Sequence, residues 1–170
     1  MGTRLFMSPS EKARRAKRAG KAPTTQAGEF VREEVRKIRR GERGARSPQQ
    51  MIAIGLSKAR RAGVALAPPG PGRAKESTRR STKYAYDVGQ HKRKARRRPR
   101  VARAVSQVLE REPRSSASPR AMSRQAKRAA SLRTAAQRSA AARRAATTKG
   151  ARARSAAARR AARTRARRKG

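Results

Sequence analysis

The chain of 170 residues carries 50 Lys and Arg against 9 Asp and Glu, which gives a formal net charge of +41 at pH 7. Self-repulsion at that charge opposes a compact state, and a polyanionic partner relieves it. Disulfides and thiolate metal sites are excluded because the chain has no Cys. No apolar run approaches the ~20 residues that cross a bilayer, so no membrane association is expected.

Residues 8–66 are predicted to form a small helical domain of three short helices. The segment 8–11 (SPSE) has the pattern of a capping box with Pro at the first helical position, and this helix should stop at Gly20. A second helix should begin near Thr24 or Thr25 and end at Gly41. Its apolar residues recur at helical spacing and are expected to share one face: Ala27, Val31, Val35 and Ile38.

The third helix is predicted to begin with another capping box at 47–50 (SPQQ) and to end at Ala62. Gly63 suits the left-handed position after the last turn, and Val64 is placed to pack back on that turn. The apolar residues expected on this helix are Met51, Ile52, Ile54 and Leu56.

Residues 67–100 are predicted to be a linker followed by a basic segment. The Pro- and Gly-rich stretch 68–72 is incompatible with a helix or a sheet. A polar stretch then reaches the run 92–98 (KRKARRR), which is typical of a nucleic-acid patch or a nuclear-localisation signal. Residues 101–112 are predicted to be a short amphipathic helix because Val101, Val105, Val108 and Leu109 share a face.

Residues 113–170 form an Ala- and Arg-rich basic tail with 19 basic residues, 20 alanines and no acidic residue. The octapeptide SAAARRAA occurs at 139–146 and again at 155–162. Ala and Arg favour helix, but like charges four residues apart oppose it, and large apolar anchors are nearly absent. The expected fold class is therefore mainly α, with a small N-terminal helical unit and a largely disordered or conditionally helical polybasic remainder.

The sequence contains few of the residues that commonly act in catalysis. His91 is the only histidine, Asp87 is the only aspartate, and the adjacent Glu33 and Glu34 diverge around a helix. The sequence has no triad pattern, metal-ligand cluster or phosphate-binding Gly-Lys-Ser/Thr loop. The protein is therefore predicted not to be an enzyme and to need neither a cofactor nor a metal.

Two features have both a binding and a structural interpretation. Tyr84 and Tyr86 could stack on bases, but two residues share a face at that spacing only in an extended strand, so local packing is preferred. The third helix, with Lys58, Arg60 and Arg61, could enter a groove of DNA. We favour a core role for its apolar residues, with the basic residues solvated or on phosphates.

The segments 28–34 (GEFVREE) and 44–63 (GARSPQQMIAIGLSKARRAG) resemble the GEFVREE…GARSxxQAIAIGLSxARRAG signature of a family of small basic bacterial proteins. Met51 departs from the Ala of that pattern. Proteins of this family are often labelled DNA-binding or plasmid-stabilisation proteins, and the tail is similar in composition to histone-H1-like proteins. The resemblance implies a bacterial, cytoplasmic and nucleoid-associated setting, and it supplies no catalytic residue.

These observations together predict non-sequence-specific DNA binding by phosphate neutralisation. About 41 phosphates occupy roughly 70 Å of duplex, which is longer than a typical specific site. A histone-like, nucleoid- or plasmid-associated role follows. The expected phosphate contacts are Arg93, Arg96, Arg97, Arg98, Arg143, Arg144, Arg159, Arg160, Arg167 and Arg168.

Alternatives from other classes remain open. Phosphate contacts form with RNA as well, so an RNA- or ribosome-associated protein is the first alternative. The second is a protein-interaction module, in which residues 1–66 recruit a partner and the tail only localises it. A membrane-active peptide is less favoured because the tail has few bulky apolar residues. The sequence does not indicate an oligomeric state.

Overall fold

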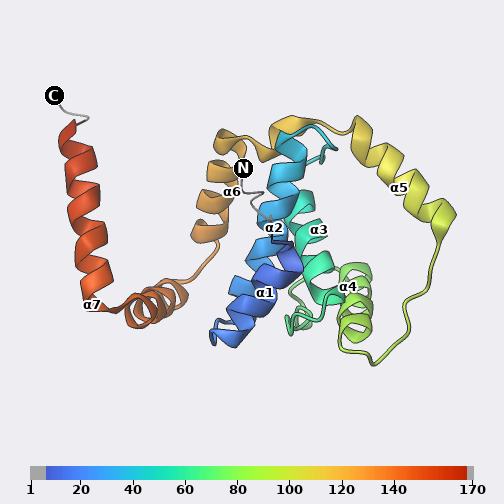
Figure 1. Ribbon diagram of the computed structural model, residues 1–170, viewed down its shortest axis with the longest axis horizontal. Helices are drawn as coiled ribbons and strands as arrows, with labels where there is room; N and C mark the ends of the chain where they lie inside the picture. The colour runs from blue at the N-terminus through green and yellow to red at the C-terminus, as the bar shows by residue number, and fades with distance from the viewer. Residues whose placement is uncertain (1–6, 168–170) are drawn as a thin grey trace, which may run out of the picture. The chain divides into compact units, whose positions relative to one another are not determined.

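The computed structural model describes residues 7–167, apart from the side chains of residues 148 and 149 (Figure 1). Over this range the fold is mainly α-helical, as predicted, and the described residues contain no strand. Two compact units follow one another in the chain, the N-terminal unit Met1–Gln125 and the C-terminal unit Ala126–Gly170. The elements are α1 (Pro9–Arg18), α2 (Pro23–Arg39), α3 (Pro48–Arg61), α4 (Glu76–Gly89), α5 (Pro99–Arg111), the 3₁₀ turn η1 (Arg114–Ala117), α6 (Pro119–Ser131) and α7 (Ala135–Arg167).

The ends of α1 follow the local sequence signals. The Ser8 hydroxyl accepts a hydrogen bond from the Glu11 amide at 3.2 Å, and the Glu11 carboxylate accepts one from the Ser8 amide at 2.6 Å, so the predicted capping box is formed. These two hydrogen bonds lower the pKa of Glu11. The helix closes on Gly20, whose φ is +65°. Its predicted start and stop are confirmed.

Two predicted helix starts differ from the structure in detail. The second helix begins at Pro23 after Ala22, without a side-chain cap, instead of at a capping Thr. The fixed φ of proline suits the first helical position and accounts for this start. In α3 the Ser47 hydroxyl accepts from the Gln50 amide at 3.2 Å, but the Gln50 side chain accepts from the Arg46 amide at 2.7 Å. The second capping box is therefore only half formed.

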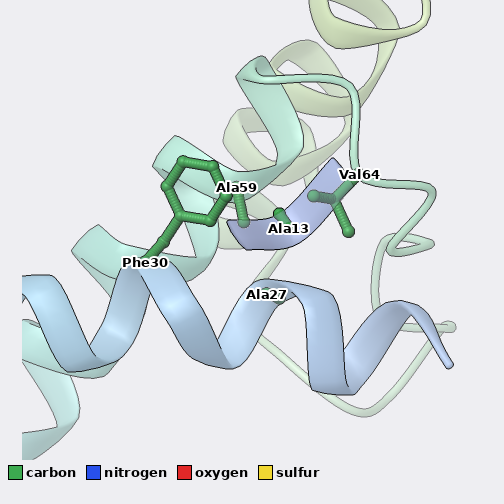
Figure 2. Close-up of a cluster of buried hydrophobic side chains, with 5 residues drawn as sticks. All are labelled: Ala13, Ala27, Phe30, Ala59 and Val64. Atoms are coloured by element: carbon green, nitrogen blue, oxygen red, sulfur yellow. The ribbon is translucent and has the colours of Figure 1, made fainter. Parts of the chain in front are cut away.

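A first core cluster joins the first three helices. Five buried side chains, from α1, α2, α3 and the turn after α3, point toward one another (Figure 2). They are Ala13, Ala27, Phe30, Ala59 and Val64. The Val64 amide donates to the Ala59 carbonyl at 3.1 Å as the chain turns at Gly63, which confirms the predicted packing of Val64 on the last turn of α3.

The buried face of α2 is rotated slightly from the predicted one. Ala27 and Ile38 are buried as expected, whereas Val31 and Val35 are only partly buried. Phe30 and the charged Glu34 take the central positions of the face. The apolar pattern of this helix did not predict that Glu34 is buried. A carboxylate is buried only where other parts of the fold supply its partners, and the local sequence does not show them.

Glu34 obtains those partners from the loop before α3 and from α3 itself. Its side chain is 3% exposed and forms ion pairs with Arg43 and with Lys58, whose Nζ lies 2.8 Å from the carboxylate. A buried carboxylate is tolerated only when it is paired and hydrogen-bonded. The Glu34–Lys58 ion pair therefore holds α2 against α3, and Lys58 has a structural role.

Glycines allow neighbouring helices to approach closely. A Cβ on Gly55 of α3 would lie 2.8 Å from the Val31 Cα of α2, and one on Gly89 of α4 would lie 1.7 Å from the Arg60 carbonyl oxygen of α3. Any side chain at either position would push two backbones apart. Each of the first four helices packs against the next one in the chain: α1 on α2, α2 on α3, and α3 on α4 (Figure 1).

The helix α4 lies within the range 67–100, where sequence analysis placed only a linker and a basic segment. It has few large apolar residues, which is why the apolar pattern did not indicate a helix. Its buried residues are the small Ala85 and Gly89, and it packs on α3. The predicted amphipathic helix at 101–112 corresponds to α5.

The chain returns to the first three helices after α5. The Gly44 amide donates to the Leu109 carbonyl at 2.7 Å, and the Arg39 Nε donates to the Ala117 carbonyl at 3.0 Å. A second core cluster forms here, with partly buried side chains around it. Its buried members are Ile38, Ala45, Met51 and Ala117.

The C-terminal unit has a different character. The long helix α7 is interrupted at Gly150, which has φ 67° and ψ 164°, and each side of the break carries one SAAARRAA copy. None of its described side chains is buried. The expected disorder of the tail is therefore not confirmed, and conditional helicity stays a prediction.

Candidate nucleic-acid interface

The α7 helix presents five of the ten predicted phosphate-binding arginines. All five are exposed: Arg143, Arg144, Arg159, Arg160 and Arg167. The helix carries them as adjacent pairs within the two octapeptide copies, followed by Arg167 in the last turn. The remaining predicted tail residue, Arg168, lies outside the described residues.

The charge of the C-terminal unit has no acidic counterpart. Residues 126–170 contain sixteen Lys and Arg and no Asp or Glu. The Nε of Arg160 donates to the Ala156 carbonyl at 3.4 Å, and that of Arg154 donates to the Gly150 carbonyl at 3.3 Å. These contacts to neutral backbone carbonyls leave each guanidinium charge uncompensated by any carboxylate of its own unit.

The basic run 92–98 folds back on α4 instead of extending away from it. His91 ends that helix in the left-handed conformation, with φ +57°, and the Lys92 amide closes on the Asp87 carbonyl at 2.8 Å. The Arg96 amide then donates to the Tyr84 hydroxyl at 2.8 Å. The guanidinium carbon of Arg93 lies 5.1 Å from the centroid of the Tyr84 ring, a cation–π contact.

This fold-back borders a solvent-open hollow of about 500 Å³, which we call the basic pocket, and all of its cationic lining residues are exposed. It contains three of the predicted phosphate contacts, Arg93, Arg96 and Arg98, whereas Arg97 of the same run does not line it. Its lining consists of five cationic side chains and one tyrosine: Arg61, Tyr84, Arg93, Lys94, Arg96 and Arg98.

Sequence analysis identified the run but missed two of the residues that complete the pocket. Arg61 comes from the last turn of α3, 32 positions before Arg93, and no local pattern connects them. For Tyr84, base stacking and local packing were both open, with local packing preferred. Its hydroxyl holds the backbone of the run, and the Arg93 guanidinium lies over its ring. The only sequence feature that could have indicated the pocket is a tyrosine, Tyr84, shortly before the cationic run.

The basic residues of α3 are mostly used inside the fold. Arg60 is 9% exposed, and its Nε donates to the Leu66 carbonyl at 2.9 Å, which holds the start of the linker. Burial lowers the pKa of Arg60 from its usual value. Lys58 pairs with Glu34 and is partly exposed, and Arg61 is exposed. Arg60 therefore departs from the expectation that these basic residues are solvated or on phosphates, whereas Lys58 pairs with Glu34 and still reaches solvent.

No group of three or more His, Cys, Asp or Glu side chains within residues 7–167 is arranged to hold a metal ion. None of the helices in the described part of the chain combines the length and apolar character needed to cross a membrane.

Comparison with known proteins identifies no protein-family model, curated protein or solved structure that matches the chain. The resemblance to the family of small basic bacterial proteins is thus a hypothesis based on residues 28–34 and 44–63. Within this chain, several residues of those segments have structural tasks: Glu34 and Lys58 pair, and Gly55 permits the approach of α3 to α2.

Proposed function

We propose that the protein binds DNA without sequence specificity, by neutralising backbone phosphates, in a nucleoid- or plasmid-associated role in bacteria. The observation that carries this proposal is the C-terminal unit, which contains no Asp or Glu and whose described cationic side chains are all exposed. An ordinary solvated surface mixes both signs of charge. A unit of one sign releases counterions when it meets a polyanion, and this release drives binding. The proposed role requires no catalysis.

The arginines proposed to contact phosphates are distributed over two regions. One set is the run of Arg93, Arg96, Arg97 and Arg98 in the N-terminal unit, and the other comes from the tail: Arg143, Arg144, Arg159, Arg160, Arg167 and Arg168. Guanidinium groups match phosphate oxygens through paired donors, which favours such contacts. Since the charge is distributed, replacement of any one arginine should change DNA affinity only slightly.

The tail is further proposed to be conditionally helical. Repulsion among like charges opposes α7 in the free chain, and phosphates remove that repulsion. A peptide of residues 126–170 should therefore gain helical circular dichroism when short duplex DNA is added at low salt. A peptide that is already fully helical without DNA would contradict conditional folding while leaving DNA binding intact.

The main test is a salt series of duplex DNA binding by the full chain and by residues 1–125. The cut after Gln125 keeps Ala117 and Met122, which pack in the second core cluster. The logarithm of affinity should fall with the logarithm of salt with a slope of about −0.9 per phosphate neutralised. The shorter chain should give a much shallower slope. Equal slopes for the two chains would refute binding through the tail.

A competition assay separates DNA from RNA as the target. Duplex DNA and a structured RNA of equal length compete for the full chain at one salt concentration. The proposal expects DNA to compete at least as well as RNA. A preference for RNA of about tenfold, or ~1.4 kcal/mol, would overturn the choice of DNA.

A further inference from the structure

The basic pocket has the size and charge of a small-molecule site. Its volume of about 500 Å³ lies within the range of ligand cavities in proteins, ~300–1,000 Å³. Five cationic side chains from α3 and from the run 92–98 line it, and no carboxylate does. Cations repel one another when they converge, so a bound anion with several charges would stabilise this arrangement.

A duplex backbone can contact these exposed arginines at the surface, but it does not fill the pocket. A cavity of this volume is roughly 10 Å across, and one strand of duplex places a phosphate every ~3.4 Å of axis, so the strand would offer about three single charges. Those phosphates also lie on a convex surface, whereas the pocket is concave. A chain of phosphates joined through shared oxygens concentrates its charge more densely and fits inside a cavity.

The Tyr84 ring does not provide a free platform for a base. Arg93 already lies over the ring, and the Tyr84 hydroxyl is used to accept from the Arg96 amide. Tyr84 thus acts as a positioning residue that holds the cationic run against α4. Recognition in the pocket rests on guanidinium and ammonium groups, which bind carboxylate and phosphate oxygens; five of them together favour the ligand with the denser negative charge, a polyphosphate.

We infer that the basic pocket is a binding site for a compact polyphosphate group, such as inorganic tripolyphosphate or the triphosphate of a nucleotide, with one site per chain. This site goes beyond non-specific DNA binding and does not depend on it. Arg61 and Arg98 contact the ligand from two different elements, the end of α3 and the start of α5.

The chain contains a local reporter for this site. Tyr84 and Tyr86 are its only tyrosines, and it has no Trp. In a full-length Tyr86→Phe variant, tyrosine fluorescence reports on Tyr84 alone, and ligand bound elsewhere on the tail gives no direct signal. Titration with sodium tripolyphosphate at constant ionic strength should change the fluorescence and saturate at one ligand per chain. An unchanged signal at saturating ligand would overturn the inference.

Matched variants separate the pocket from general charge. In the Tyr86→Phe background, Arg61→Gln and Arg98→Gln each remove a cation that lines the pocket, and Arg97→Gln removes one from the same run that does not. The first two should weaken tripolyphosphate binding about tenfold, as expected for a lost charge-assisted contact, and the third less than about twofold. Equal losses in all three variants would mean that only net charge matters and would overturn the inference. Far-ultraviolet circular dichroism of each variant checks that the fold is retained.

The source of the polyphosphate is distinguished by two further ligands, a nucleoside triphosphate and a long linear polyphosphate. Tighter binding of the first identifies a nucleotide, and tighter binding of the second identifies the inorganic polymer; each supports the site. Duplex DNA serves as the third arm. If DNA changes the Tyr84 signal and needs Arg61 and Arg98, while tripolyphosphate does neither, the pocket belongs to DNA and the inference fails. DNA binding in the salt series would stand in that case.

Discussion

The two units of this protein use the same abundant residues, Ala and Arg, in opposite ways. In the N-terminal unit, Ala27 and Ala59 are fully buried where helices cross, and Arg60 is buried with backbone carbonyls as partners. In α7 none of the described side chains is buried, and the arginines are exposed. All nine acidic residues precede residue 113, so only the first unit can pair its charge internally. Composition therefore does not determine burial; the presence of carboxylates, glycines and a few large apolar side chains does.

The largest contrast within the N-terminal unit is expected between two neighbouring carboxylates. Glu34→Gln leaves Arg43 and Lys58 without their buried partner and should lower the free energy of unfolding by about 3 kcal/mol, the lower end for a broken buried pair, because Lys58 reaches solvent. Glu33→Gln removes only exposed pairs with Arg36 and Arg40 and should cost less than ~1 kcal/mol. Urea unfolding followed by tyrosine fluorescence measures both. Similar losses would show that Glu34 is not the tie between α2 and α3.

The two units are compared directly by the same substitution in each. Leu109 is 8% exposed at the return of the chain to Gly44, and Leu132 of the C-terminal unit is 79% exposed. Leu109→Ala should lower the free energy of unfolding by about 2 kcal/mol, whereas Leu132→Ala should change it by less than ~0.5 kcal/mol. A substantial loss from Leu132→Ala in urea unfolding would mean that the C-terminal unit buries this side chain.

A smaller effect of opposite sign is expected at two helical glycines. A Cβ at Gly28 would meet nothing within 4 Å, so Gly28→Ala should stabilise α2 by up to ~1 kcal/mol through helix propensity. Gly55→Ala gains the same propensity but forces the backbones of α2 and α3 apart, and it should destabilise by about 1–2 kcal/mol. Thermal unfolding of both variants decides the matter, and a stabilising Gly55→Ala would show that the two helices can separate at little cost.

The smallest expected contrast is the response to acid. Hydrogen bonds from Ser8 lower the pKa of Glu11, and for Glu33 hydrogen bonds from Arg40 and Arg36 outweigh the opposing effect of burial and also lower the pKa. Because both folded-state values lie below the ordinary 4.5, the stability they contribute is present above pH 4.5 and is lost as the pH falls below it. The C-terminal unit has no carboxylate side chain. Its helical circular dichroism in a peptide of residues 126–170 should stay constant from pH 7 to pH 3, while the full chain loses stability.

Local signals were sufficient to predict much of the fold. Ser-Pro pairs start α1 and α3, and Gly20, Gly41 and Gly63 follow the ends of the first three helices with positive φ. Such features depend on a few adjacent residues, so the sequence displays them directly. The family resemblance, the DNA target and the absence of catalysis stay predictions, because neither the fold nor the comparisons test them.

Contacts between distant residues were not predictable in the same way. The helix α4 packs through Ala85 and Gly89, which carry little apolar signal on their own. The basic pocket forms because Tyr84 holds the run 92–98 near Arg61. The spacing of residues along the chain does not predict this contact. Arg60 looked like a surface cation because its carbonyl partners follow it in an irregular segment.

The return of the chain at Leu109 has a consequence for proteolysis. The run 92–98 is exposed and rich in trypsin sites, yet the segments on both sides of it pack on the first three helices, Leu66 at the first core cluster and Ala117 in the second. Arg60 holds the chain at Leu66, and Met51 and Ile38 hold it again at Ala117. A single cut in the run should therefore leave a nicked protein whose two fragments stay associated and separate only when the core is unfolded.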